Sequence, residues 1–370
     1  MIAAAFLVIA AAGCLYLLFA ATVVPKAGAR STAGSPPVTI LKPLHGDEPG
    51  LFENLASFHA QNYPAPVQII FGVHDDRDSA IGVVERLQAE FPDADLQLVV
   101  DQTPHGSNLK VGNLINLARH ARYDCVVLAD SDIRVEPGYL GDVVATLSEP
   151  GVGAATCLYR GVAAGGFWSR LSALGIDAHF LPNVLVGLKT GLAAPCFGST
   201  IAMTRDRLEQ IGGFEAFTDR LADDYAIGAA IRSAGLRVAI SNMLVAHSCW
   251  ESSFLDLWRR ELRWARTIKS IDPVGYAGSL VTHPLGWALL GAASGAPASG
   301  LGLAALAIAS RIVLMSAVSR NFGLVRPPYW LAPPRDLLSF VVFLSSFLGN
   351  DLTWRGRRYR MQPNGRLILE

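Results

Sequence analysis

Two long stretches without charge limit what this chain can fold into. No Asp, Glu, Lys or Arg occurs between Ile2 and Val24, or between Pro273 and Ser310. About 20 apolar residues are enough to cross a bilayer as a helix. The whole chain of 370 residues has only 17% charged residues, whereas soluble domains carry about 25%. The sequence therefore predicts a membrane-associated protein.

Composition excludes several other classes of protein. A hydrophobic content of 51% is too high for a disordered chain. Five scattered cysteines without a CxxC pair do not form the framework of a small disulfide-stabilised domain. The 31 basic residues are balanced by 31 acidic residues, which argues against a nucleic-acid partner because such proteins carry a basic surface.

The first apolar stretch is interpreted as a retained anchor covering residues 1–25. A cleaved signal peptide is the alternative, but it has a basic start and an apolar core of about 7–15 residues. Here nothing basic precedes Ile2, and the apolar run continues to Val24. Lys26 and Arg30 follow it, so the positive-inside rule predicts that the chain after residue 25 is cytoplasmic.

A second membrane region is expected over residues 273–353. The sequence Gly295-Ala296-Pro297 divides it into candidate helices at about 281–296 and 300–319. A third apolar run at 337–350 suits either a span or an interfacial segment. The final segment, 354–370, contains Arg355, Arg357, Arg358, Arg360 and Arg366. This density predicts a cytoplasmic tail and an even number of C-terminal crossings.

Between the membrane regions, short apolar runs alternate with helical patterns, which predicts an α/β domain over residues 36–272. Strands are expected at 38–44, 67–73, 96–100 and 125–129, and helices at 51–61, 81–91 and 109–121. This alternation indicates βαβ units and a parallel sheet. Ligands of such sheets bind outside the carboxyl ends of the strands.

Acidic residues follow two of these strands. Asp75 comes after the second strand, and Asp130 and Asp132 come after the fourth. Residues two apart on an extended segment lie on one face, so Asp130 and Asp132 can approach one cation; turn formation and helix capping are the alternative. No Gly-rich phosphate-binding motif is present. Lys110, at a loop–helix junction, either reaches a phosphate or is simply solvated.

Two downstream segments carry further candidates. Asp224, next to Asp223, opens a helical stretch, where it is either a catalytic base or a helix cap. The segment 254–269 is an amphipathic helix that contains Arg260, Arg263 and Trp264. It is expected to lie on a membrane surface or to hold a leaving diphosphate through its arginines.

Taken together and in order, these residues resemble a known enzyme family. Asp75, Asp130-x-Asp132, Asp224 and Arg260-x-x-Arg263-Trp264 are similar to the D, DxD, D, (Q/R)xxRW series of family-two glycosyltransferases with a GT-A fold. Further segments resemble ceramide glucosyltransferases and their bacterial relatives, including hopanoid-biosynthesis glycosyltransferases that act on bacteriohopanetetrol. These are Lys42-Pro43-Leu44-His45-Gly46, Asn62-Tyr63-Pro64, Asn108-Leu109-Lys110, Asp130–Val135, Asp223-Asp224-Tyr225 and Trp354–Arg360.

The resemblance implies a GT-A domain that performs an inverting transfer from a UDP-sugar to a lipid hydroxyl. It implies that Asp75 contacts the uridine, that Lys110 and Asp130 bind the nucleotide, and that Asp132 binds Mg²⁺ or Mn²⁺. The same resemblance implies that Arg260 and Arg263 contact the leaving diphosphate and that Trp264 packs near donor and acceptor. Asp224 would act as the base on the acceptor hydroxyl.

The acceptor is expected to come from the bilayer of a bacterial inner membrane. The apolar stretch 167–194 lacks strong strand or helix signals, and it is either part of the acceptor entrance or an ordinary buried segment. His179 lies in it and either lines the acceptor site or is structural. The sequence leaves open the sugar (glucose or N-acetylglucosamine) and the lipid: a hopanoid polyol, ceramide, polyprenyl phosphate or diacylglycerol. A non-catalytic membrane protein is the remaining alternative.

Overall fold

A computed structural model describes residues 1–26, 28, 34–349, 351–354, 357–361 and 367–369, with side chains up to residue 349. By its internal contacts the chain forms two compact units. The sheet unit comprises residues 28–164 and 194–250, and the helical unit comprises residues 1–27, 165–193 and 251–370. Arg30, Arg355 and Arg366, which entered the topology prediction, lie outside the described residues.

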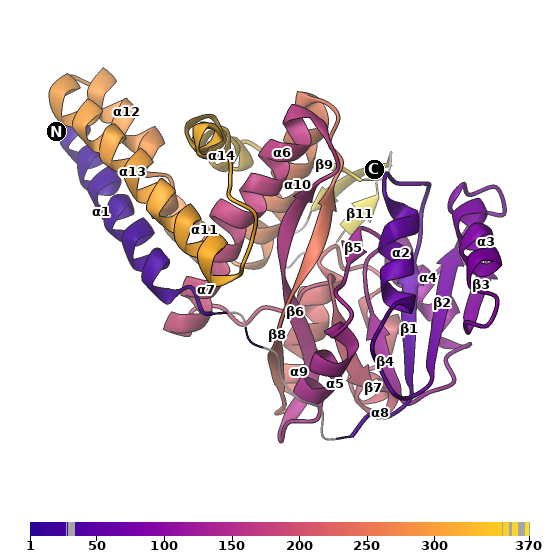
Figure 1. Cartoon of the computed structure of the whole chain (residues 1–370). Coiled ribbons are helices and arrows are strands. Elements are labelled where there is room, and N and C mark those ends of the chain that lie inside the picture. The colour runs from indigo at the N-terminus through magenta and orange to yellow at the C-terminus, as the bar shows by residue number, and fades with distance from the viewer. Residues whose placement is uncertain (27, 29–33, 350, 355–356, 362–366, 370) are drawn as a thin grey trace. The chain divides into compact units, whose positions relative to one another are not determined.

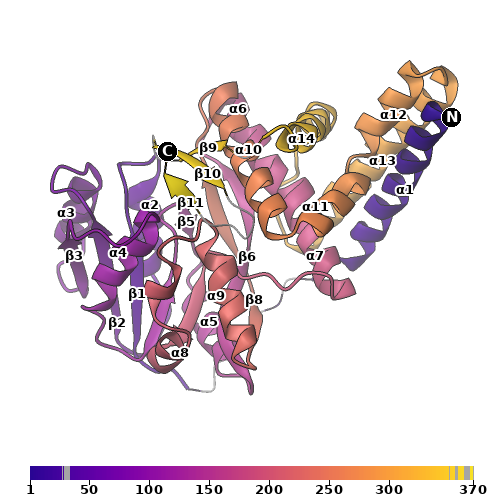
Figure 2. The ribbon, with the colours of Figure 1, turned by 180° about the vertical axis from the view of Figure 1, so that it is seen from behind.

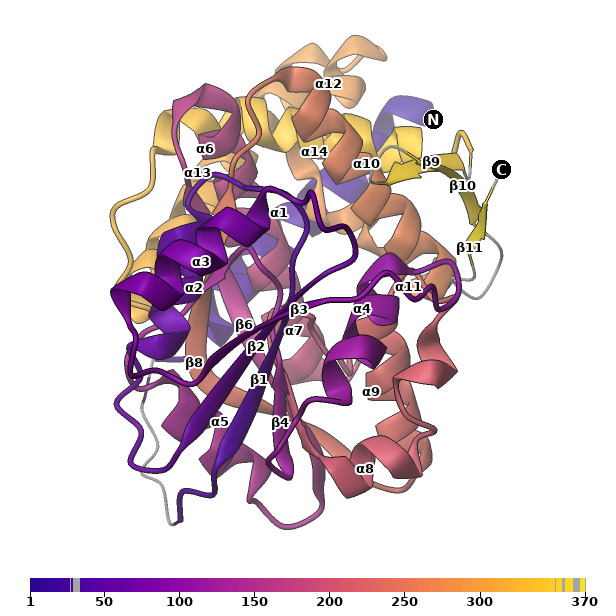
Figure 3. The same cartoon turned by 90° about the vertical axis from the view of Figure 1, so that its right-hand side faces the viewer.

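The sheet unit combines eight strands with helices on both faces. Its strands are β1 (Val38–Pro43), β2 (Val67–Val73), β3 (Leu96–Val100), β4 (Cys125–Leu128), β5 (Ile133–Arg134), β6 (Val152–Ala163), β7 (Ile201–Thr204) and β8 (Arg237–Cys249). Its helices are α2 (Leu51–His59), α3 (Ala80–Glu90), α4 (Leu109–Ala118), α5 (Tyr139–Leu147), α8 (Arg205–Gln210), η2 (Phe214–Phe217) and α9 (Asp223–Ser233). Figure 3 shows α2, α3 and α5 on one side of the strands and α4, α8 and α9 on the other.

The sheet has the strand order β3-β2-β1-β4-β7-β6-β8-β5. Strands β1 to β4 are parallel, as the alternating pattern predicts. The other half is mixed, because β7 is antiparallel to both β4 and β6, and β5 is antiparallel to β8. The prediction of a parallel sheet is therefore confirmed for the first four strands only.

Close packing between strand β2 and helix α4 depends on Gly72. A Cβ atom at this position would lie 2.3 Å from Asn113 Oδ1 and 2.5 Å from Leu117 Cδ2. The Asn113 side chain uses this proximity to donate a 2.7 Å hydrogen bond from Nδ2 to the Gly72 carbonyl. The core on this face also contains Ile70 and Leu114, both fully buried.

The helical unit contains the apolar segments of the chain (Figure 1). Its helices are α1 (Ile2–Val23), α6 (Gly166–Gly175), the π-helix η1 (Ile176–Phe180), α7 (Leu181–Thr190), α10 (Phe254–Ile271), α11 (Pro273–Gly278), η3 (Ser279–Thr282), α12 (Pro284–Ala293), α13 (Pro297–Asn321), η4 (Tyr329–Leu331) and α14 (Ala332–Ser346). Three short strands, β9 (Asp351–Trp354), β10 (Arg357–Met361) and β11 (Leu367–Leu369), follow as an antiparallel sheet.

Among the described residues, three helical segments are long and apolar enough to cross a membrane. They are Ile2–Val23, Gly166–Thr190 and Pro297–Asn321. The first and third match the predicted anchor and one of the predicted C-terminal helices. The second was not predicted as a helix, because its sequence lacks a clear helical pattern. It combines α6, η1 and α7, and it is largely buried within the structure.

Helices α1, α12 and α13 lie side by side through small residues (Figures 1 and 2). Ala10, Cys14, Ala288, Ala304 and Ala307 form a shared buried cluster with Leu285. Small side chains let helix backbones approach closely, which is the usual basis of helix association in membranes. The predicted pair of helices is thus confirmed, with α12 shorter and α13 longer than expected.

We predict that Gly72→Ala destabilises the protein by about 1–3 kcal/mol, because the added methyl group must displace Asn113 or Leu117. The measurement is the thermal unfolding midpoint of the detergent-solubilised protein, followed by intrinsic fluorescence.

Gly82→Ala is the matched control. Gly82 lies inside α3, and a Cβ there meets nothing within 4 Å. Alanine should therefore stabilise the helix by about 0.5–1 kcal/mol. A Gly72→Ala variant that unfolds at the wild-type temperature would contradict the close packing of β2 on α4.

Candidate active site

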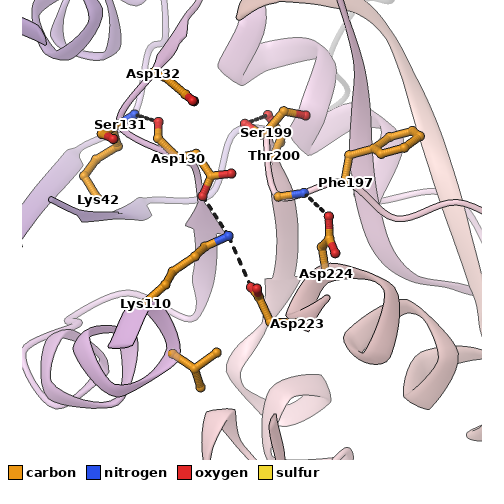
Figure 4. A network of polar contacts seen from close by, with 12 residues as sticks. Lys42, Lys110, Asp130, Ser131, Asp132, Phe197, Ser199, Thr200, Asp223 and Asp224 are labelled. Atoms are coloured by element: carbon orange, nitrogen blue, oxygen red, sulfur yellow. Dashed lines mark hydrogen bonds and ion pairs between the residues drawn. The ribbon is translucent and has the colours of Figure 1, made fainter. Parts of the chain in front are cut away.

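Asp130 and Asp223 of the sheet unit gather around one lysine (Figure 4). Lys110, in the first turn of α4, places its Nζ 2.7 Å from Asp130 Oδ1 and 3.2 Å from Asp223 Oδ2. Asp130 follows strand β4, and Asp223 opens helix α9. Three separate chain segments therefore meet at this ammonium group.

Burial and mutual attraction set the protonation of this cluster. Burial alone would lower the pKa of Lys110, but the carboxylates of Asp130, Asp223 and Asp224 outweigh it and raise the pKa above its usual value. Burial also raises the pKa of Asp130, although Lys110 opposes this shift. Lys110 is therefore a permanent cation that allows carboxylates to share one site.

Asn108 fixes the position of Lys110. Its side-chain oxygen accepts hydrogen bonds from the backbone N–H groups of Lys110 and Val111, and so caps α4. Its Nδ2 donates to the carbonyl oxygen of Arg220 at 2.7 Å and to Asp223 Oδ1 at 3.5 Å. The cap thus also ties the start of α4 to the start of α9.

Lys42 holds the turn that carries Asp130 by a contact to its backbone. This lysine is fully buried at the end of β1. Its Nζ donates a 2.5 Å hydrogen bond to the Asp130 carbonyl and lies 3.8 Å from the centre of the Phe58 ring. Burial lowers the pKa of Lys42 to about 7, against the attraction of Asp130 and Asp132.

Asp224 faces the loop that precedes β7. Its Oδ2 accepts a 3.0 Å hydrogen bond from the backbone N–H of Gly198, and its Oδ1 accepts one of 2.7 Å from Tyr225. Burial and the neighbouring Asp223 raise the pKa of Asp224 to about 6. A carboxyl group with a pKa near neutrality is well suited to accept a proton.

Gly198 closely approaches the ion pair of Lys110 and Asp130. A Cβ atom there would lie 2.8 Å from Lys110 Nζ and 2.9 Å from Asp130 Oδ2. The Gly198 carbonyl also accepts a hydrogen bond from the backbone N–H of Asp130. The loop therefore approaches the DxD turn and Asp224 at the same time.

Asp132 has a neighbour that the sequence did not suggest. His247, in β8, places Nε2 3.3 Å from Asp132 Oδ2. Within the described part of the chain, Asp132 Oδ1 is buried without a hydrogen-bond partner. No group of three or more His, Cys, Asp or Glu side chains forms a complete metal site there. One carboxylate and one imidazole fit a divalent cation that takes its other ligands from substrate phosphates.

Asp75 contacts Arg77 rather than the residues of this cluster. It follows β2 as predicted, but its side chain is half exposed, and its Oδ1 accepts a 2.9 Å hydrogen bond from the Arg77 backbone. Hydrogen bonds from Arg77 lower the pKa of Asp75. Its predicted contact with uridine stays a prediction.

The remaining predicted residues belong to the helical unit. On α10, the Arg260 guanidinium contacts Ser172 Oγ and Glu251 and lies 4.3 Å from the Trp264 ring centre. Arg263 lies one turn further along the same helix. His179 lies in η1 and forms a 2.8 Å contact between Nε2 and Asp336 Oδ1. Their roles toward donor and acceptor stay predictions.

Sequence reasoning missed Lys42, Gly198 and His247 as site residues. Lys42 carries a weak signal, because a charged residue in an otherwise apolar strand calls for a buried partner. Gly198 and His247 have no local signal, since their relation to Asp130 and Asp132 arises only from the pairing of β4 with β7 and of β5 with β8.

This sheet, with carboxylates at the carboxyl end of β4, has the GT-A fold of glycosyltransferases. The fold is shared with a mannosyltransferase from Pyrobaculum calidifontis, solved with GDP-mannose and Mn²⁺, at a TM-score of 0.56 and 20% identity. The match covers 94% of this chain and 98% of that one.

More specifically, the chain belongs to glycosyl transferase family 21, whose profile matches residues 5–367. It is similar to ceramide glucosyltransferase 1 of Caenorhabditis elegans, with 25% identity over 348 residues, covering 90% of this chain and 73% of the nematode protein. Ceramide glucosyltransferase 3 of the same organism is 28% identical over 248 residues, covering 62% of this chain and 50% of the relative. The resemblance to ceramide glucosyltransferases is thereby confirmed.

We predict that Lys110→Met destabilises the protein by about 3 kcal/mol at pH 8. This is the lower end of the range for broken buried pairs, because the Asp130 side chain is 34% exposed. Without the ammonium group, which opposes the shift, the pKa of Asp130 rises further in the folded state. The loss is therefore full above this folded pKa, and it shrinks as the pH falls toward the unfolded value of about 3.9. Unfolding at pH 8 and pH 5 measures this difference.

Lys189→Met is the control, because Lys189 is exposed and its loss should change stability by less than about 0.5 kcal/mol. The double variant Lys110→Met/Asp130→Asn should recover part of the lost stability. Equal stability of Lys110→Met and wild type at pH 8 would contradict a structural role of the cluster.

Proposed function

We propose that this protein is a membrane-bound inverting glycosyltransferase that moves glucose or N-acetylglucosamine from a UDP-sugar to a lipid hydroxyl. A hopanoid polyol or ceramide is the proposed acceptor. The names of the nematode relatives support a lipid acceptor and a glucosyl donor. The observation that carries the proposal is the joint placement of Asp224 and the Asp130-x-Asp132 turn around Lys110 and Gly198.

In the proposed reaction, Asp224 takes the proton of the acceptor hydroxyl. The oxygen then attacks the anomeric carbon, and the bond from that carbon to the diphosphate oxygen breaks, so that UDP leaves. Because the pKa of Asp224 is raised to about 6, its carboxylate is basic enough to take the proton while remaining ionised at neutral pH.

The leaving diphosphate needs positive charge. Lys110 supplies a permanent cation at the DxD turn. Asp132 and His247 would hold Mg²⁺ or Mn²⁺, which neutralises charge on the diphosphate when it is bound. The proposal keeps Asp75 as the uridine contact, Arg260 and Arg263 as diphosphate contacts, and Trp264 near donor and acceptor.

The membrane supplies the acceptor in this proposal. The anchor at 1–25 and the C-terminal region at 273–353 hold the protein in a bacterial inner membrane, with the 36–272 domain and the 354–370 tail in the cytoplasm. The candidate spans Ile2–Val23 and Pro297–Asn321 support the membrane attachment in this proposal. His179 is the proposed contact to the acceptor.

The decisive experiment supplies membranes containing the protein with radiolabelled UDP-glucose or UDP-N-acetylglucosamine. We expect a labelled lipid, identified by mass spectrometry, together with release of UDP. EDTA should abolish both signals, and added Mn²⁺ or Mg²⁺ should restore them. Purified protein that releases no UDP with either donor would overturn the proposal in favour of a non-catalytic membrane protein.

We predict that Asp224→Asn lowers kcat by about 10²–10⁴-fold, because an amide cannot accept the proton. Binding of UDP, measured by calorimetry, should stay close to wild type. The wild-type rate should rise with pH through about 6 and should be about tenfold lower at pH 5 than at its plateau, since only the ionised carboxylate acts as a base.

Asp223→Asn tests the rival base. Asp223 contacts Lys110 rather than the Gly198 loop, so its replacement should weaken donor binding. The rate should still depend on pH, but its midpoint should move below 6, because the charge of Asp223 helps to raise the pKa of Asp224. Near-normal activity of Asp224→Asn would move the base elsewhere, with Asp223 as the first candidate.

A further inference from the structure

A fully buried arginine lies in the middle of the apolar helix α13. Arg311 is 1% exposed and uses all three of its nitrogen atoms. Its Nε donates to Asp336 Oδ2 at 3.1 Å, and its two terminal nitrogens donate to the carbonyl oxygens of Ala178 (2.6 Å) and Thr282 (2.9 Å). Ionisable residues inside membrane segments are rare, and they commonly mark functional sites.

Asp336 connects this arginine to a histidine. It accepts from Arg311 on one side, and it contacts His179 Nε2 at 2.8 Å on the other. The imidazole ring of His179 stacks on His283, with 6.3 Å between the ring centres. Helices α13 and α14, the π-helix η1 and the start of α12 therefore meet at one polar centre.

Beside this satisfied centre lie buried polar atoms without partners. Among the described residues near this centre, four buried atoms have no hydrogen-bond partner. They are His283 Nδ1, Ser339 Oγ, and the Nε and one terminal nitrogen of Arg335. Each of these side chains belongs to a residue that is at least nine-tenths buried. Native proteins leave few such groups unpaired, because burying a polar group without a hydrogen bond is unfavourable.

Two of these side chains, Arg335 and Ser339, lie one turn apart on helix α14. Ser339 lies one turn after both Arg335 and Asp336 and one turn before Phe343. The His283 ring lies 5.0 Å from the ring of Phe343 and 6.1 Å from that of Phe340. The hydroxyl of Ser339 is thus bracketed by residues that face His283 and His179.

The charges of this region cancel. Arg311 is paired with Asp336, and Arg335 is paired with Glu261 on α10. The unpaired atoms therefore offer hydrogen bonds without net charge. Such a site favours neutral hydroxyl or amide groups over a phosphate, because an added anion would remain uncompensated away from water.

We propose that His283, Ser339 and Arg335 bind the hydroxyl or amide groups of an uncharged lipid acceptor. Arg311 and Asp336 act as positioning residues that hold this site, and Asp336 orients His179, the acceptor contact of the proposed function. The inference deepens the proposed function, on which it rests, by assigning the polar groups of the lipid acceptor to the buried side chains of His283, Ser339 and Arg335. It disfavours polyprenyl phosphate.

The test measures lipid binding without a sugar donor. Purified full-length protein is titrated with N-hexanoylsphingosine, with its 1-phosphate and with bacteriohopanetetrol, and the complexes are followed by native mass spectrometry. We expect at least one neutral lipid to bind, and the phosphate to bind at least about tenfold more weakly than that lipid.

Two variants remove the unpaired atoms of Ser339 and His283 with little change in shape. Ser339→Ala deletes the hydroxyl, and His283→Phe keeps a ring against Phe340 and Phe343. Each should weaken binding of the neutral lipid about fivefold or more, and should raise the acceptor KM with little change in the donor KM. Ser346→Ala is the control on the same helix, because its hydroxyl already donates to the Phe343 carbonyl.

Unchanged lipid binding and acceptor KM in both variants would overturn the inference, because the polar atoms would then hold water only. Binding of the phosphate as tightly as the neutral lipid would overturn it as well, as would wild-type protein that binds neither neutral lipid. Failure of sugar transfer with normal, variant-sensitive lipid binding would instead overturn the proposed function and leave this inference standing.

Discussion

The ammonium group of Lys110 is the interaction on which the candidate active site depends. Carboxylates from β4 and α9 lie close together at a buried edge of the sheet, where their mutual repulsion would otherwise be large. Lys110 neutralises it, while Asn108 caps α4 and fixes the lysine relative to α9. The helix cap, the ion pairs and the close approach of Gly198 are therefore all concentrated around the side chain of Lys110.

The parallel half of the sheet could be predicted because its strands are short apolar runs between polar turns. The predicted bounds of β2 and β3, Val67–Val73 and Leu96–Val100, agree with the structure. The antiparallel half could not, because β6 and β8 pair across more than 80 residues and β8 contains polar residues such as Asn242 and His247. No local pattern encodes such a pairing.

The site was predictable as far as residue type and strand position allow. Asp130 and Asp132 follow β4 as expected, and Lys110 lies at the predicted loop–helix junction. The carboxyl ends of the strands meet at one edge because of the βαβ topology. Asp223 and Asp224 could not be separated by sequence, since neighbours on a helix differ only by a rotation of about 100°. That rotation directs Asp223 toward Lys110 and Asp224 toward Gly198.

The wide turn η1 gives the segment Gly166–Thr190 an unusual property. A π-turn accommodates one additional residue within a helix, so the α-helical portions on its two sides are out of angular phase by about 100°. Side chains after Phe180 therefore point in directions that an uninterrupted α-helix would not give them. Deletion of one residue from η1 would keep the segment helical but would rotate α7 about the helix axis relative to α6. His179 would then turn away from Asp336.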